Sequence, residues 1–152
     1  MSTPEQASAA LERRLHVVIV TGDQTVYDGN ADCVLAPGVN GQIGVLAHHA
    51  PLLAALEAGE LVVRAGQDEE SFAVGGGFIE VRDNEVIVLA DTAERAAEID
   101  VARAEAARQK ASLLVKQYRE RPESVSAWQA LRRSRARLKV AGRRAGRGSA
   151  SS

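Results

Sequence analysis

Short runs of alternating apolar and polar residues, separated by turn formers, fill the chain over about residues 15–89. Aliphatic and β-branched residues at every second position are typical of strands with one buried face. Short strands at this spacing predict an antiparallel sandwich or barrel. The first strands are expected at 15–20, 25–27 and 32–36, with breaks at 21–23 and 28–30.

The clearest strand pair lies at 78–82 and 85–89, on either side of Asp83 and Asn84. Both of these residues tolerate left-handed backbone, so the pattern predicts a β-hairpin with a two-residue turn. The three glycines at 75–77 precede a strand and lack the Lys-Ser/Thr of a phosphate-binding loop. They therefore indicate a bulge or a close backbone approach. The segment 38–44 is predicted to form turns between strands.

After residue 89 the pattern changes to that of helices. Asp100 is a good N-cap, and 101–118 contains neither glycine nor proline, which predicts a helix about 27 Å long. Pro122 ends this helix. A second helix is expected at about 124–140, closed by Gly142, with an apolar stripe formed by Val125, Trp128, Leu131 and Leu138.

These elements predict a mainly β plus α fold, in which an N-terminal antiparallel β-sandwich is followed by a C-terminal antiparallel two-helix hairpin. The expected divisions are a polar extension at 1–13, the sandwich at 14–92, the hairpin at 93–141 and a disordered tail at 142–152. The first helix offers mainly alanines until its end. At about 25 cal/mol per Å² of buried apolar area, its packing is weak, so we expect a hairpin that can detach and act as a switch.

The net charge of −1 conceals two halves of opposite charge. Residues 1–95 hold 15 acidic and 5 basic side chains, a net charge of −10, whereas residues 96–152 hold 5 acidic and 14 basic ones, a net charge of +9. This contrast indicates an acidic partner for the C-terminal half, either nucleic acid or a protein surface, or attraction between the halves themselves.

Composition also limits the cellular setting. Charges interrupt every apolar stretch well before the roughly 20 residues of a membrane span. The first ten residues lack the basic start and apolar run of a secretory signal. We therefore expect a cytoplasmic chain that associates with membranes only indirectly.

Two groups of residues invite a chemical interpretation. The adjacent His48 and His49 are candidate metal ligands, but neighbours in a strand point to opposite faces, and no third ligand is evident, so no metal site is predicted. No G-x-S-x-G motif supports a nucleophilic serine, and no catalytic residue is predicted. A basic helix face is suited to a solvated surface, an acidic protein or a nucleotide: Arg132, Arg133, Arg135 and Arg137.

The run GQIGVLAHHAPLL at 41–53 resembles the G-x-(I/L)-G-(V/I)-L-x-x-H-A-P-L segment of ATP synthase epsilon subunits. GGGFIEV at 75–81 and VLADTAE at 88–94 are similar to the segments that follow in that family. The resemblance covers about residues 15–140. It departs at Ala47, where the family more often has proline, and at the neutral Asn40 and Gln42, where many relatives carry a carboxylate.

This resemblance implies a non-catalytic epsilon subunit in the central stalk of a rotary, proton-translocating bacterial ATP synthase. Its partners would be the gamma subunit, the c-subunit ring and the alpha and beta subunits of the catalytic head, at the cytoplasmic face of the plasma membrane. No nucleic acid and no direct membrane insertion are expected. The implied contact residues are Asn40 and Gln42 toward the ring, His49 in a structural role or at the gamma interface, and Arg132 and Arg135 toward the beta subunit.

The resemblance further implies that the hairpin inhibits ATP hydrolysis when extended and that ATP is a possible regulatory ligand of the compact form, with no cofactor required. IDVARA at 99–104 resembles the I/L-D-x-x-R-A motif of ATP-binding epsilon subunits. Lys110 stands where those relatives have a further arginine, so the positive charge is kept but the bidentate hydrogen bonding of a guanidinium group is lost. The implied ATP ligands are Glu94, Asp100, Arg103, Lys110, Arg133 and Arg137.

Two rival hypotheses remain open on the sequence alone. One is a free-standing β-sandwich binding module with a basic nucleic-acid-binding tail. The other is a small hydrolase that uses His48 or His49.

Overall fold

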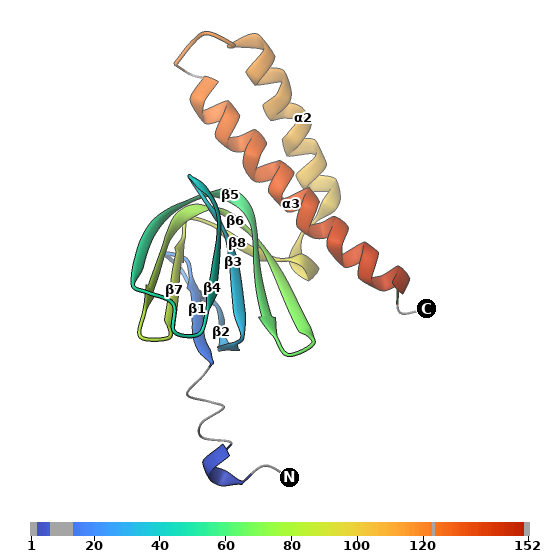
Figure 1. Ribbon diagram of the computed structural model, residues 1–152. Coiled ribbons are helices and arrows are strands. Elements are labelled where there is room, and N and C mark those ends of the chain that lie inside the picture. Colours follow the sequence, from blue (N-terminus) through green and yellow to red (C-terminus); the bar gives the residue numbers. More distant parts are fainter. Residues whose placement is uncertain (1–2, 7–13, 123, 151–152) are drawn as a thin grey trace.

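The computed structural model (Figure 1) describes residues 3–6, 14–122 and 124–150, with the backbone alone described for 143–150. After a short helical turn at residues 4–6 comes a β-sandwich, and two helices follow and lie across one end of it. The predicted N-terminal extension at 1–13 falls largely outside the described residues. The strands are β1 (Leu15–Val20), β2 (Thr25–Ala31), β3 (Cys33–Gly38), β4 (Gly41–Leu46), β5 (Leu52–Ala65), β6 (Asp68–Arg82), β7 (Glu85–Ala90) and β8 (Ala93–Arg95).

One continuous sheet forms both layers of the sandwich. The strand order is β2-β1-β7-β6-β5-β3-β4, and β8 pairs with β6. The long strand β6 pairs with β8 through residues 72–74 and with β7 through residues 77–82, so its two halves serve different parts of the sheet. The predicted antiparallel arrangement is confirmed, with one parallel ladder between β1 and β7.

The glycine run lies where β6 changes partners. Gly76 and Gly77 have φ angles of 107° and 126°, in a region that side chains disfavour. A Cβ on Gly77 would lie 2.0 Å from the carbonyl oxygen of Leu89. The predicted close backbone approach is therefore confirmed.

Several strand predictions hold and two are wrong. β1 has the predicted bounds, and the β6–β7 turn consists of Asp83 and Asn84 with φ angles of 50° and 61°. The predicted break at 28–30 instead continues β2, because these residues pair with β1 and Asp28 binds the His16 ring. The predicted turns at 38–44 shrink to two residues, since Gly41–Leu46 forms β4 against β3.

A short 3₁₀ turn, η1 (Ala96–Glu98), leads into α2 (Val101–Gln117) and α3 (Ser124–Ala150). Asp100 caps α2 as predicted, since its Oδ1 accepts from the Arg103 N–H at 3.0 Å. The predicted helix end near 140 and the disordered tail from 142 are wrong through residue 150. A glycine inside a helix costs only about 1 kcal/mol, so Gly142 does not stop α3.

The large core belongs to the sandwich. Among the described residues, the largest fully buried side chains all come from its strands, with Phe72, Leu15, Ile19, Leu61 and Ile79 foremost. The hairpin contacts the sandwich mainly through α3, which packs on β5 and β6, while α2 packs on α3.

Two small clusters hold the hairpin. The first joins it to the sandwich through Ala73, Ile99, Ala104, Val140 and Ala141. The second lies between the helices and contains Ala111, Val115, Ala127 and Leu131. The predicted stripe on α3 is only partly correct: Leu131 is buried, but Val125 and Trp128 are 59% and 42% exposed, because the face that packs on α2 is formed by Ala127, Ala130 and Leu131.

Candidate functional site

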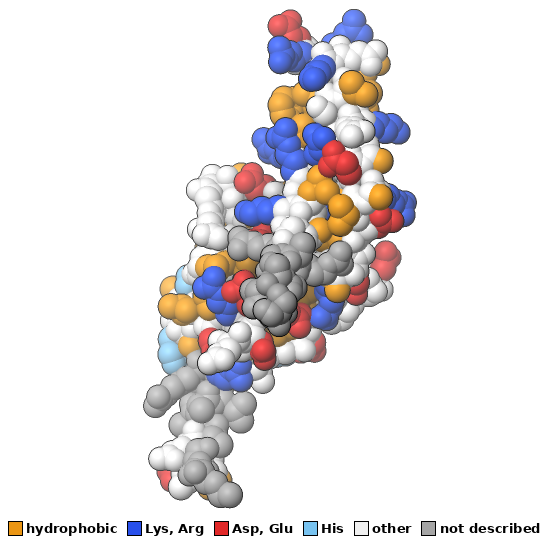
Figure 2. All heavy atoms as spheres, turned by 90° about the vertical axis from the view of Figure 1, so that its right-hand side faces the viewer, with side chains coloured by type: hydrophobic (Ala, Val, Ile, Leu, Met, Phe, Trp, Pro, Cys, Tyr) orange, Lys and Arg blue, Asp and Glu red, His pale blue; other side chains and the backbone are white. Residues whose placement is uncertain are grey.

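The opposite charges of the two halves meet where α3 lies on the sandwich. Arg137 Nε lies 3.0 Å from Glu94 Oε1, and Arg132 Nη1 lies 4.0 Å from Glu57 Oε2. Figure 2 shows Lys and Arg side chains gathered over the helices, with Asp and Glu more frequent below them. Attraction between the halves, one of the explanations offered by the charge pattern, is therefore present in the fold.

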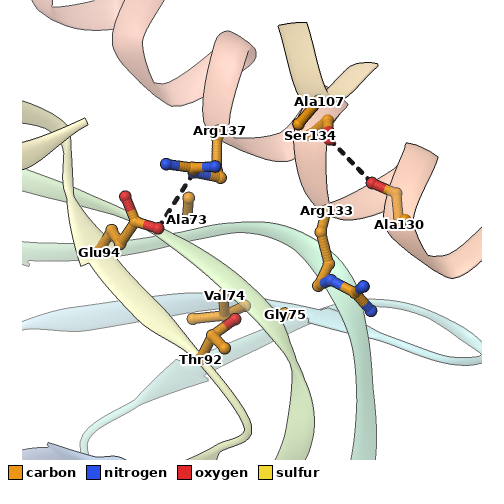
Figure 3. Close-up of a pocket in the computed structure, with 10 residues that line it drawn as sticks. All are labelled: Ala73, Val74, Gly75, Thr92, Glu94, Ala107, Ala130, Arg133, Ser134 and Arg137. Carbon is orange, nitrogen blue, oxygen red and sulfur yellow. Dashed lines mark hydrogen bonds and ion pairs between the residues drawn. The ribbon is translucent and has the colours of Figure 1, made fainter. Parts of the chain in front are cut away.

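A cavity of about 240 Å³ opens beneath α3 (Figure 3). It is built where β6, β8 and both helices converge, so every wall comes from a different stretch of the chain. Its lining residues are Ala73, Val74, Gly75, Thr92, Glu94, Ala107, Ala130, Arg133, Ser134 and Arg137.

The two arginines of this cavity point in different directions. Arg137 turns toward Glu94, whereas Arg133 extends toward the glycine run of β6. Ser134 lines the cavity, and its hydroxyl donates to the Ala130 carbonyl at 2.9 Å. A cavity with two guanidinium groups and one carboxylate suits a ligand that carries both anionic oxygens and hydrogen-bond donors.

Gly75 sets how closely α3 can approach. A Cβ at this position would lie 2.1 Å from Thr92 Oγ1 and 3.1 Å from Arg133 Cδ. The Gly75 N–H also donates to the Thr92 carbonyl at 2.9 Å. The absence of a side chain at Gly75 therefore makes room for Arg133 beside Thr92, which directly precedes β8.

Only part of the predicted ATP-binding set comes together. Glu94, Arg133 and Arg137 line the cavity, but Asp100, Arg103 and Lys110 do not. Asp100 serves as the cap of α2, and Arg103 and Lys110 are exposed along that helix.

The sequence analysis missed three residues that line the cavity, namely Gly75, Thr92 and Ser134. No local pattern signals them, because the cavity exists only through the long-range contact of β6 with α3.

A second, more polar groove of about 590 Å³ runs between β5 and the outer side of α3. On its sandwich side lie Glu57 and Glu60, and on its helix side lie Arg132, Arg135 and Lys139. Gln42, a predicted ring contact, lines the end of this groove. Here carboxylates and cations from the two halves face each other across solvent.

The remaining predicted contact residues lie on the surface. Asn40 is exposed in the β3–β4 turn. His49 is half-buried, and its Nδ1 contacts the Ala50 carbonyl oxygen at 2.6 Å. His48 has a φ of 66°, and its backbone N–H donates to Asn84 Oδ1 at 2.6 Å. Within the described part of the chain, no group of three candidate ligands is placed to hold a metal ion.

An apolar patch covers the outer face of β5, β6 and β7. Phe78 pairs directly with Leu89. Ile87 lies two residues before Leu89 on β7 and therefore on the same face of the sheet. These side chains are 55%, 53% and 37% exposed, and Leu53 on β5 is 71% exposed. A patch of large apolar side chains on a small protein indicates a protein contact.

A titratable group ties three strands together away from the hairpin. His16 on β1 places Nε2 2.7 Å from Asp28 Oδ1 and Nδ1 2.7 Å from Glu85 Oε2. These two contacts, first that with Asp28 and then that with Glu85, raise the pKa of His16 above its ordinary 6.5. Both ring nitrogens act as donors when the imidazole is protonated.

Comparison with known proteins defines the class. The family model for the ATP synthase delta/epsilon chain β-sandwich domain matches residues 14–96, and that for the long α-helix domain of the same chains matches residues 97–142. The chain therefore belongs to the ATP synthase delta/epsilon chain family. Within the described residues, no helix is long and apolar enough to cross a membrane.

The relatives narrow this family to epsilon chains. The ATP synthase epsilon chain of Dehalococcoides mccartyi is 46% identical over 132 residues, which cover 86% of this chain and 94% of the relative. That of Anaeromyxobacter dehalogenans is 52% identical over 126 residues, covering 82% and 96%. A chain in the mitochondrial ATP synthase of Euglena gracilis shares the fold at 21% identity, with a TM-score of 0.70 over 85% of this chain and 81% of that chain.

Proposed function

We propose that the chain works as the non-catalytic epsilon subunit of a rotary, proton-translocating bacterial ATP synthase. Its place would be the central stalk at the cytoplasmic face of the plasma membrane. The observation that carries this proposal is family membership across both parts, from residue 14 to residue 142. It favours the rotor subunit over a free-standing sandwich with a nucleic-acid-binding tail. It also gives no support to a small hydrolase.

Co-purification tests this function. A tagged chain expressed with the other subunits should recover alpha, beta, gamma and c subunits, as expected for a stalk component. Recovery of nucleic acid without these subunits would instead support the binding-module hypothesis.

The apolar patch of β5, β6 and β7 is the proposed docking face for the gamma subunit. It offers exposed large apolar side chains around Glu80, which lies between Leu53 and Ile87 on this face, and a stable subunit interface is richest in apolar contacts at its centre. Phe78→Glu should abolish co-purification with gamma. The matched control is Leu113→Glu on α2, which also places a charge at an exposed large apolar residue (66% exposed) and should leave gamma binding intact. Equal binding by both variants would remove this face from the interface.

The hairpin, when extended, is proposed to inhibit ATP hydrolysis through its arginines, which would meet an acidic surface of the beta subunit. Replacing Arg132, Arg133, Arg135 and Arg137 together with alanine should raise the ATPase rate of the assembled complex. Inhibition by the unmodified chain should also weaken as salt screens the charges. An unchanged rate would show that these charges do not contribute to inhibition.

ATP is proposed as a regulatory ligand of the compact form, bound without hydrolysis in the cavity beneath α3. The support is that Glu94, Arg133 and Arg137 gather there, two of them cations that suit phosphate oxygens. Bound ATP would stabilise the docked hairpin by mass action and so relieve inhibition.

Isothermal titration of the isolated chain tests this site. ATP should release heat, and Arg133→Ala and Arg137→Ala should each abolish it. Arg119→Ala, at an exposed position in the turn that follows α2 and outside the cavity lining, is the control and should bind as the unmodified chain does. Absence of heat at millimolar ATP would refute the proposal.

A further inference from the structure

The same arginines of α3 are placed to serve two mutually exclusive partners. In the compact form, Arg132 lies 4.0 Å from Glu57 on β5, and Arg135 and Lys139 face Glu57 and Glu60 across the second groove. Arg137 is paired with Glu94 on β8. Arg132, Arg135 and Arg137 are also among the residues expected to contact the beta subunit when the hairpin is extended. This inference therefore rests on the proposed function.

We propose that Glu57, Glu60 and Glu94 form an acidic latch that competes with the beta subunit for the arginines of α3. These carboxylates lie on the sandwich and meet α3 only when the hairpin is docked. The arginines, in contrast, interact favourably in both states. The latch thus favours the docked state without adding any attraction to the extended one.

The weak apolar contact makes such a latch effective. The cluster that joins the hairpin to the sandwich contains two buried large aliphatic residues, Ile99 and Val140, among alanines, and the partly buried Leu138 packs against it. When apolar docking is this small, a few ion pairs shift the balance between two states. Exposed pairs each change an equilibrium by about twofold to fivefold, and salt reduces their contribution.

The latch predicts opposite effects from its two sides. Removing a latch carboxylate frees the hairpin but leaves its arginines available, so inhibition of the assembled enzyme should become stronger. Removing an arginine also frees the hairpin but weakens its contact with the beta subunit, so inhibition should become weaker. A merely structural role would make both changes act alike.

Docking is best measured in the isolated full chain. Donor and acceptor dyes on Gln67→Cys and Arg119→Cys, in a Cys33→Ser background, report separation of hairpin and sandwich by energy transfer. Glu57→Lys should lower the ratio of docked to undocked molecules by about fivefold. Adding Arg132→Glu to Glu57→Lys should restore docking, because the charges are exchanged. The control is Asp23→Lys in the β1–β2 turn, which makes the same charge change at an exposed residue outside both cavities.

The ATPase rate of the assembled enzyme is the second measurement. Glu57→Lys should lower the ATPase rate, and Asp23→Lys should leave it unchanged. An unaltered energy-transfer ratio in Glu57→Lys, or a failure of the charge exchange to restore docking, would overturn the latch. If instead removal of the whole hairpin did not raise the ATPase rate, the proposed inhibitory function would be wrong, while the docking measurement would still decide the latch.

Discussion

The sandwich and the hairpin bury different kinds of side chains. In the sandwich the interior consists of large residues such as Phe72, Leu61 and Ile79, which are fully buried. In the described part of the hairpin most buried apolar positions are alanines, and the larger aliphatic side chains buried between the helices are Val115 and Leu131. Full burial of a large apolar side chain stabilises by about 1.5–3 kcal/mol, against about 0.8 kcal/mol for a single CH₂ group.

This difference means that one part is a stable body and the other is a marginal attachment. The hairpin uses small side chains, which allow close helix packing but contribute little free energy. A region with few large buried groups opens at low cost. The composition of the hairpin therefore fits a part that changes state while the sandwich stays folded on its partners.

The largest effect is expected from Phe72→Ala. This ring is fully buried and packs edge-on against Tyr27 at 5.7 Å between centroids. Its removal should lower the free energy of unfolding of the sandwich by about 3–5 kcal/mol. Urea denaturation followed by β-sheet circular dichroism measures this loss. A loss near zero would mean that the sandwich core is not the source of stability.

A smaller and local effect is expected from Leu131→Ala, at a cost of about 2–5 kcal/mol to the hairpin alone. Trp128, the single tryptophan, lies on α3 and reports the hairpin by fluorescence. Its transition should move to lower urea while the transition of the sandwich keeps its midpoint. If both signals shifted together, the two parts would form one cooperative unit.

Gly75→Ala should loosen the docking of α3, because its Cβ would lie 3.1 Å from Arg133 Cδ on that helix, in addition to 2.1 Å from Thr92 Oγ1 within the sandwich. Overpacking of this kind typically costs about 1–3 kcal/mol, and the hairpin is the part that can move away. The dye-labelled chain should show a larger undocked fraction. Gly22→Ala is the matched control, since a Cβ there meets nothing within 4 Å. Equal docking in the two variants would contradict the geometry at Gly75.

The smallest effect concerns pH and lies wholly in the sandwich. Asp28 and Glu85 raise the pKa of His16 above 6.5. A raised pKa in the folded state gives stability that is fully present below pH 6.5 and is lost as the pH rises through the raised value. His16→Gln should flatten this dependence above pH 6.5, as measured by urea denaturation. The exposed site makes the change small, and a variant that retained the full dependence would exclude His16 as its origin.

Local patterns in the sequence predicted the architecture well. Alternation identified β1 and the β6–β7 hairpin, and the Asp100 cap located the start of α2, because each of these depends on residues close in sequence. The glycine run was correctly predicted as a close approach. The motif resemblance supplied the family, which the comparisons then confirmed.

The failures came where long-range pairing or helix continuation decided the outcome. Asp28, Gly29 and Asn30 resemble a break, but pairing with β1 makes them a strand. Gly142 resembles a stop, but it lies inside α3. The cavity residues Gly75, Thr92 and Ser134 could not be grouped from spacing, since β6, the β8 segment and α3 meet only in the folded chain. Whether the predicted ligands bind ATP stays a prediction.

The central claim, that a self-sufficient sandwich carries a detachable hairpin, is tested most directly by the fragment 1–95. This cut keeps β8, whose Arg95 donates to the Val26 carbonyl at 2.6 Å and to Glu70 at 2.9 Å. We predict that the fragment unfolds in one cooperative thermal transition, close to that of the sandwich in the full chain. A broad, non-cooperative transition would show that the sandwich needs the hairpin and would contradict the account.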